Sequence, residues 1–248
     1  MILLVVILYG FSRKVADMVS KAQDMESLSL QKELTQNISH ELKTPLAGIR
    51  GYLETMNLHP EMPEETRRQY MERSLSLTRR LADLVEDLST LDVAQMAALR
   101  QDVDVAEIIS QVLQDTEADF KEKKMSIRVD IPQAIPVRGD RKLLYGLFRN
   151  LTDNSLRYAG EGSTVTLHAR QEGRKWHFDF ADDGPGVPEE SLPHLYERFF
   201  RTDKGRSREL GGTGLGLSIV YEAVRIHGGE IRAQSVSPHG LMHVFTLQ

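Results

Sequence analysis

Two apolar stripes with helical spacing constrain the fold of the first part of the chain. Apolar residues at intervals of three and four run from Leu34 to Met56, which predicts a helix with one buried face. A second stripe runs from Leu77 to Leu91 with the 4-3-4-3 spacing of a coiled-coil seam. The intervening residues 57–63 contain two prolines and break the periodicity. The pattern therefore predicts two amphipathic helices joined by a short loop.

A single helical hairpin gives each apolar stripe only one partner helix. Two copies of the hairpin, packed as a four-helix bundle, would cover both stripes. We therefore predict a homodimer whose dimerisation domain spans residues 31–98. The expected fold class is an all-α helical hairpin, in a dimeric four-helix bundle, followed by an α+β sandwich.

The predicted sandwich occupies residues 99–248, where helical and strand patterns are mixed. Residues 165–169 and 176–180 alternate apolar and polar side chains and are expected to pair as strands. Helices and hairpin-linked strands in segregated runs favour an α+β sandwich over a doubly wound sheet. The other expected elements are helices at 105–123, 140–158 with Asp140 as N-cap, and 217–227, and strands at 126–131, 230–236 and 242–247.

The first eleven residues are almost wholly apolar. As a helix they would rise about 16 Å, against about 30 Å of bilayer hydrocarbon. They can be the end of a longer transmembrane helix, a membrane-touching anchor, or the buried start of a helix. Arg13 and Lys14 would put the following residues on the cytoplasmic side. We predict membrane attachment through residues 1–12, a connecting helix over 13–30, and a cytoplasmic catalytic part at the cytoplasmic membrane.

Charge and cysteine content exclude several function classes. The 31 basic and 36 acidic side chains give a net charge of −5, so no nucleic-acid partner is expected. The chain has no cysteine, which excludes disulfides, cysteine-ligated zinc and thiol catalysis.

His40 is the candidate nucleophile of the predicted hairpin. A 100° advance per residue puts its side chain on the outer face, about half a turn from the apolar stripe. Glu41 is its neighbour, Thr44 lies one turn further on, and Pro45 removes a helix donor. An exposed imidazole flanked by an acid and a hydroxyl can act as a nucleophile, although an isolated histidine is more often simply solvated.

Asn150, Asn154 and Arg157 are spaced i, i+4, i+7 on a predicted helix. The three polar groups therefore share one stripe. Side-chain carbonyl oxygens on adjacent turns suit Mg²⁺, and an arginine beside them can bind phosphate. A plain polar helix face is the alternative interpretation.

Two glycine-containing segments complete a candidate nucleotide site. Residues 182–186 (DDGPG) follow a predicted strand, and residues 212–217 (GTGLGL) precede a predicted helix, whose free N–H groups can hold phosphate oxygens. Neither a dinucleotide-binding βαβ unit nor a Gly-Lys-Ser/Thr phosphate loop fits these glycines. The charged residues 202–211 between the segments are expected to form a mobile lid.

Five segments, in this order, resemble the motifs of sensor histidine kinases. They are the H-box (NISHELKTPL, 37–46), N-box (RNLTDNSLRY, 149–158), G1 box (DDGPG, 182–186), F-box (ERFFR, 197–201) and G2 box (GTGLGL, 212–217). The resemblance covers residues 31–248. It implies a dimerisation and phosphotransfer hairpin joined to an ATP-binding domain of the gyrase/Hsp90/histidine-kinase type, and a response-regulator receiver domain as partner.

The resemblance also implies roles for individual residues. His40 would be the phospho-acceptor, Glu41 its proton acceptor, and Thr44 the residue that orients water for dephosphorylation of the regulator. Mg²⁺ would be held by Asn150 and Asn154. The expected ATP-binding residues are Asn150, Asn154, Arg157, Tyr158, Asp182, Gly184, Gly186, Arg201, Gly212, Thr213, Gly214, Leu215, Gly216 and Leu217. Among them, Asp182 would recognise the adenine base. The sequence departs from the family pattern at Ser155, where alanine is commoner.

Two other functions are compatible with the same sequence. One is a protein that binds ATP and the regulator but works mainly as a phosphatase or scaffold. The other is an ATPase clamp of the same superfamily, against which the exposed histidine on the hairpin argues.

Overall fold

The computed structural model describes residues 36–95, 101–202 and 213–248. These form parts of two compact units, Met1–Leu77 and Thr78–Gln248. The predictions for residues 1–30, for Gly212 and for all of the lid except Thr202 lie outside the described residues. Within the described ranges, no helix is both long enough and apolar enough to cross a membrane.

The predicted helical hairpin is confirmed. The first helix is described over residues 36–58 and is called the His40 helix below; α2 (Glu64–Gln95) follows it. The connecting loop is held by local hydrogen bonds, among them the Arg67 guanidinium donating to the carbonyl of Pro60 at 2.6 Å. The rings of Tyr52 and Tyr70 join the two helices with their centroids 5.0 Å apart.

One hairpin leaves part of its first apolar stripe uncovered. The side chains of Leu46 and Leu53, both in the stripe of the His40 helix, are 59% and 53% exposed. Met71 and Leu75 on α2 are exposed as well. Burying a leucine side chain is favourable by about 1.5–3 kcal/mol, so these residues favour a partner surface.

The second unit contains a five-stranded mixed sheet in the order β2-β4-β5-β7-β6. The strand pair β4–β5 is antiparallel, as the sequence predicts, with Leu167 opposite Phe180. β2 runs parallel to β4, and the remaining pairs are antiparallel. The strands are β2 (Ser126–Asp130), β4 (Thr164–Glu172), β5 (Lys175–Asp182), β6 (Ile231–Ser235) and β7 (Leu241–Leu247).

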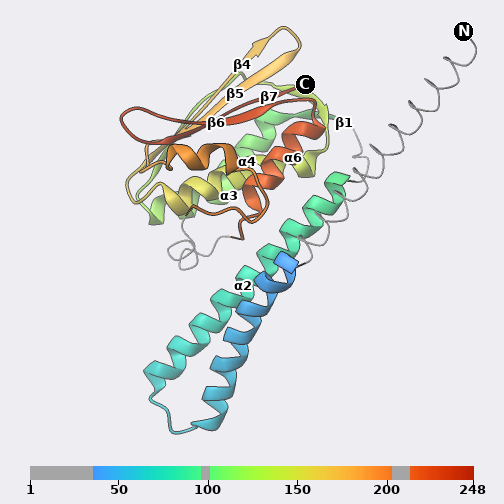
Figure 1. The fold of residues 1–248 in the computed structure, drawn as a ribbon. Coiled ribbons are helices and arrows are strands. Elements are labelled where there is room, and N and C mark those ends of the chain that lie inside the picture. Colours follow the sequence, from blue (N-terminus) through green and yellow to red (C-terminus); the bar gives the residue numbers. More distant parts are fainter. Residues whose placement is uncertain (1–35, 96–100, 203–212) are drawn as a thin grey trace, which may run out of the picture. The chain divides into compact units, whose positions relative to one another are not determined.

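Three helices cover one face of this sheet (Figure 1). They are α3 (Val105–Glu122), α4 (Arg141–Tyr158) and α6 (Gly216–Ile226). In the core between the layers, Phe178 and Phe245 from the sheet stack on each other, and Phe148 from α4 packs against both at a steep angle, with ring centroids 4.9–6.0 Å apart. The predicted cap of α4 is confirmed, since the Asp140 carboxylate accepts from the N–H groups of Lys142 and Leu143. The part of the second unit that follows α2 is therefore the expected α+β sandwich.

Three short elements were not among those predicted. Strands β1 (Gln101–Asp104) and β3 (Pro136–Gly139) form an antiparallel ribbon apart from the main sheet, and η1 (Glu189–His194) is a 3₁₀ helix after β5. Asp104 ends β1 and caps α3 through Ala106 N–H at 2.9 Å, while the same oxygen accepts from Ile135 N–H at 2.8 Å. A single carboxylate thus fixes the ribbon to the helix.

Candidate active site

His40 lies on the exposed side of its helix, as predicted. The hydroxyl of Thr44, one turn further on and also exposed, donates to the backbone carbonyl of His40 at 3.1 Å. Pro45 is buried and the helix continues through it without a break. The imidazole is therefore open to a reactant from solvent, with the Thr44 side chain fixed one turn away.

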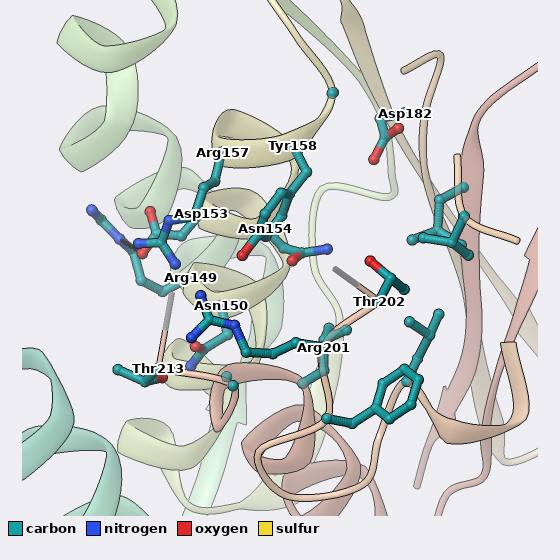
Figure 2. Close-up of a pocket in the computed structure, with 18 of the residues that line it drawn as sticks. Arg149, Asn150, Asp153, Asn154, Arg157, Tyr158, Asp182, Arg201, Thr202 and Thr213 are labelled. Atoms are coloured by element: carbon teal, nitrogen blue, oxygen red, sulfur yellow. Dashed lines mark hydrogen bonds and ion pairs between the residues drawn. The ribbon is translucent and has the colours of Figure 1, made fainter. Parts of the chain in front are cut away.

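A cavity in the second unit runs along one face of α4. It is lined by Asn150, Asn154, Arg157 and Tyr158, which are the N-box residues predicted from their spacing. Figure 2 shows their side chains on one side of the cavity and Asp182, at the end of β5, across from them. The helical period of α4 thus puts two amides and a guanidinium in one row.

The side chain of Asn150 is fixed by its own helix and by α6. Its Nδ2 donates to the carbonyl of Gly146 at 2.8 Å, which leaves Oδ1 as the free acceptor of the amide. That oxygen lies against Gly216, the first residue of α6, where a Cβ atom would come within 2.5 Å of it. The absence of a side chain at position 216 therefore provides the space that Asn150 Oδ1 occupies.

Asp182 is a buried carboxylate, 8% exposed, that the fold supplies with donors. Its Oδ2 accepts from the hydroxyl of Ser155 on α4 at 2.8 Å, and its Oδ1 accepts from the N–H of Gly184 at 3.1 Å. Burial raises the pKa of the Asp182 carboxyl above its ordinary value, and the hydrogen bonds from Ser155, Gly184 and Leu241 act in the opposite direction. The group is thus both desolvated and oriented.

The loop that carries Phe199 and the loop that carries Gly214 contact each other closely. Gly214 has φ +77°, and a Cβ there would meet the Cα of Phe199 at 2.9 Å, so a glycine is required. The Phe199 N–H donates to the Gly214 carbonyl at 2.8 Å. This contact joins the segment that carries Arg201 to the start of α6. The first N–H groups of α6 have no acceptor within the helix, as at any helix N-terminus, and Gly216 and Leu217 line the cavity.

The structure brings most of the predicted ATP-binding residues to one cavity. Gly186, Arg201, Thr213 and Gly214 line it together with the residues named above. Among the described predicted residues, Gly184 and Leu215 are not part of the lining. The N–H of Gly184 is used by Asp182, and Leu215 is fully buried with its N–H donating to the Thr213 hydroxyl at 3.2 Å.

Several lining residues were missed by the sequence reasoning. Lys142, Tyr145 and Arg149 extend the polar row of α4 towards its N-terminus, and Asp153 lies between Asn150 and Asn154. Their helical spacing could have identified them. Arg149 forms an ion pair with Asp153 at 2.9 Å. A second group forms an apolar wall, which no local pattern indicates; it consists of Val187, Pro188, Leu195, Phe200 and Leu241.

Two families of known domains match the chain in tandem. Residues 30–98 match the His Kinase A (phospho-acceptor) domain, and residues 139–248 match the histidine kinase-, DNA gyrase B- and HSP90-like ATPase family. The signal transduction histidine-protein kinase BaeS of Escherichia coli (strain K12) is 34% identical over 229 residues, which are 88% of this chain and 48% of BaeS. The chain thus spans about half the length of this relative.

Solved structures agree with the fold. Full-length ShkA in complex with AMPPNP superimposes with a TM-score of 0.61 and 26% identity, over 84% of this chain and 44% of that one. The histidine kinase ThkA, solved in complex with the response regulator protein TrrA, superimposes with a TM-score of 0.71 over 90% of this chain and 63% of that one. At 22% identity the ThkA match shows the fold alone.

Proposed function

The chain belongs to the sensor histidine kinases of two-component systems, and on that premise we propose that it phosphorylates its own His40 from Mg-ATP. The phosphoryl group is then passed to an aspartate of a response-regulator receiver domain. The observation that carries the proposal is the combination of an exposed histidine on a helical hairpin with a cavity built from the N-box, G1, F-box and G2 residues of one α+β domain.

The residues on the two sides of the cavity suit the base and the phosphates of ATP. Asp182, across from α4, accepts from the adenine amine, and Tyr158 lies against the ring. Arg157, Arg201 and the N–H groups at the start of α6 offset the charge of the phosphates. ShkA, whose structure holds the ATP analogue AMPPNP, supports this assignment.

The amides of Asn150 and Asn154 are the proposed Mg²⁺ ligands. Both line the cavity, and neutral amide oxygens on adjacent turns are suitable donors for this hard ion. Asn150 meets this requirement directly, because its Nδ2 is engaged by Gly146 and its Oδ1 remains the acceptor. When bound, the ion neutralises charge on the phosphate oxygens.

The transfer is a displacement at the γ-phosphorus. A nitrogen lone pair of His40 forms the bond to phosphorus while the bond to the β,γ-bridging oxygen breaks, and ADP leaves with that electron pair. The proton on the other imidazole nitrogen passes to Glu41, the neighbouring carboxylate. Solvent exposure of His40 permits this approach and the later approach of a receiver domain.

The active form is proposed to be a homodimer attached to the cytoplasmic membrane. Exposed Leu46 and Leu53 on the His40 helix support pairing of two hairpins. Membrane attachment through residues 1–12, the connecting helix at 13–30, and the domain boundaries 31–98 and 99–248 remain predictions from the sequence. The catalytic part would lie in the cytoplasm.

Regulator dephosphorylation is a second proposed activity of the same hairpin. Thr44 is exposed one turn from His40 and its hydroxyl is oriented by the His40 carbonyl. A hydroxyl in that place can orient water towards a phosphoaspartate. A protein acting mainly in this way would keep the Thr44-dependent activity after His40→Ala and would show little labelling of itself.

Incubation with γ-labelled ATP and Mg²⁺ tests the kinase proposal. Label that is stable in alkali and lost in acid is expected in the wild type and absent in His40→Gln. Binding of ATP without any labelling of the wild type would contradict the kinase and favour the phosphatase or scaffold.

A further inference from the structure

The hydrogen bond between Ser155 and Asp182 links two motifs across the back of the cavity. Ser155 is 2% exposed and its hydroxyl lies 2.8 Å from Asp182 Oδ2. Asp182 lines the cavity, as does Asn154, the neighbour of Ser155, whereas Ser155 is not among the described residues that line it. Any effect of Ser155 on a bound ligand therefore passes through the carboxylate.

The remaining surroundings of Asp182 are backbone groups and one like charge. The N–H groups of Gly184 and Leu241 donate to the carboxylate, and the adjacent Asp183 raises its pKa slightly in addition to burial. His239 is held nearby with its Nδ1 3.0 Å from the Gly184 carbonyl. Among the groups of the described residues that donate to Asp182, only the Ser155 hydroxyl belongs to a side chain. It is the one donor that a substitution can remove.

The protonation state of the Asp182 carboxyl determines which group at the 6-position of a purine forms the better hydrogen bond with it. An ionised carboxylate accepts from a 6-amino group, as in adenine. A protonated carboxyl presents a donor, which matches the 6-oxo group of hypoxanthine or guanine. Burial shifts Asp182 towards the protonated form, so a fixed hydroxyl donor favours the form that adenine requires.

We propose that Ser155 is a positioning residue for nucleotide recognition, whose hydroxyl holds the Asp182 carboxylate in the orientation that accepts from the 6-amino group of adenine. The inference rests on the proposed function, since it takes the cavity to be the ATP site. It adds a residue that sets the preference for a 6-amino over a 6-oxo purine.

The test compares ATP and ITP, which differ at the 6-position, by titration calorimetry with Mg²⁺, in proteins that all carry His40→Gln so that no phosphoryl group is transferred during the titration. Ser155→Ala is expected to weaken ATP binding about tenfold, as for loss of a hydrogen bond to a charged group, and to leave ITP binding unchanged or slightly stronger. The ATP affinity of Ser155→Ala should also begin to fall at a higher pH than that of the wild type. Ser155→Thr, which retains the hydroxyl, should restore the preference for ATP.

A structural role would give a different pattern. Equal weakening of ATP and ITP in Ser155→Ala, together with a lower unfolding temperature, would overturn the proposal. So would an unchanged ratio of ATP to ITP affinity, whatever Ser155→Thr does. Because binding is measured without phosphorylation, the two proposals can fail separately. Absence of labelling on His40 would contradict only the kinase activity. A wild type that is labelled, together with an unchanged ratio of ATP to ITP affinity in Ser155→Ala, would contradict only the role of Ser155.

Discussion

Replacing Gly216 by alanine is expected to displace the proposed Mg²⁺ ligand Asn150. The added Cβ would lie 2.5 Å from Asn150 Oδ1, whereas ordinary contacts begin at 3.4 Å, so the amide must move by the difference, about 0.9 Å. Asn150 is also bound to the Gly146 carbonyl, which the movement would strain or break. A catalytic group misplaced by about 1 Å can cost about 100-fold in rate.

The assay for Gly216→Ala combines ATP titration, with and without Mg²⁺, with the initial rate of His40 labelling. We expect the Mg²⁺-dependent part of the ATP affinity to be lost and labelling to slow by about 100-fold. The unfolding temperature should not fall much, because the atom that must move is the end of a side chain and not backbone. Gly51→Ala on the His40 helix is the matched control, since a Cβ there meets nothing within 4 Å.

Two results would refute this reasoning. Labelling at the wild-type rate in Gly216→Ala would mean that phosphorylation does not depend on the position of the Asn150 amide. A comparable loss in Gly51→Ala would mean that the effect has nothing to do with the contact between α4 and α6.

Three further predictions concern other parts of the chain. Burial lowers the pKa of His243 from 6.5 to about 4, so the unfolded state gains a proton first as the pH falls. The free energy of unfolding should therefore decrease by about 3 kcal/mol between pH 6.5 and 4. Denaturant titrations over this range measure that decrease, and a free energy of unfolding that does not change with pH would contradict it. Asp104→Ala removes the α3 cap and the acceptor of Ile135 N–H and should lower the free energy of unfolding by about 1–3 kcal/mol. Asp102 is exposed, so Asp102→Ala should change the free energy of unfolding little and serves as the control. Thr44→Ala should slow dephosphorylation of a receiver domain while His40 labelling continues; equal loss of both would contradict a separate role for Thr44.

Periodicity predicted most of the fold because it reports burial directly. The alternation in 165–169 follows from one face of β4 packing on the core, where Val165, Leu167 and Ala169 are buried. In the stripe from Leu34 to Met56, the described residues are half-buried or exposed, as on a helix face that one hairpin covers only in part. Asp140 was predicted as a cap because capping is a local interaction. Where the determinant of structure lies within one turn or one strand, the sequence was sufficient.

The elements that were missed depend on distant residues. The ribbon of β1 and β3 has four residues per strand, too few for a pattern. Asp104 caps α3 locally, but its second donor, the N–H of Ile135, lies 31 residues further along the chain. The same holds for the site. The row on α4 was visible in the spacing of Asn150, Asn154 and Arg157, whereas the bond from Ser155 to Asp182 spans 27 residues and joins a helix to a strand end.

Direct mapping of the phosphorylated residue tests the central claim most sharply. The protein, incubated with Mg-ATP and kept at neutral or alkaline pH, is digested and analysed by mass spectrometry. We predict one added phosphoryl group on His40 and none in His40→Gln. A phosphoryl group on another residue, or an unmodified His40 in a protein that binds ATP, would contradict the account.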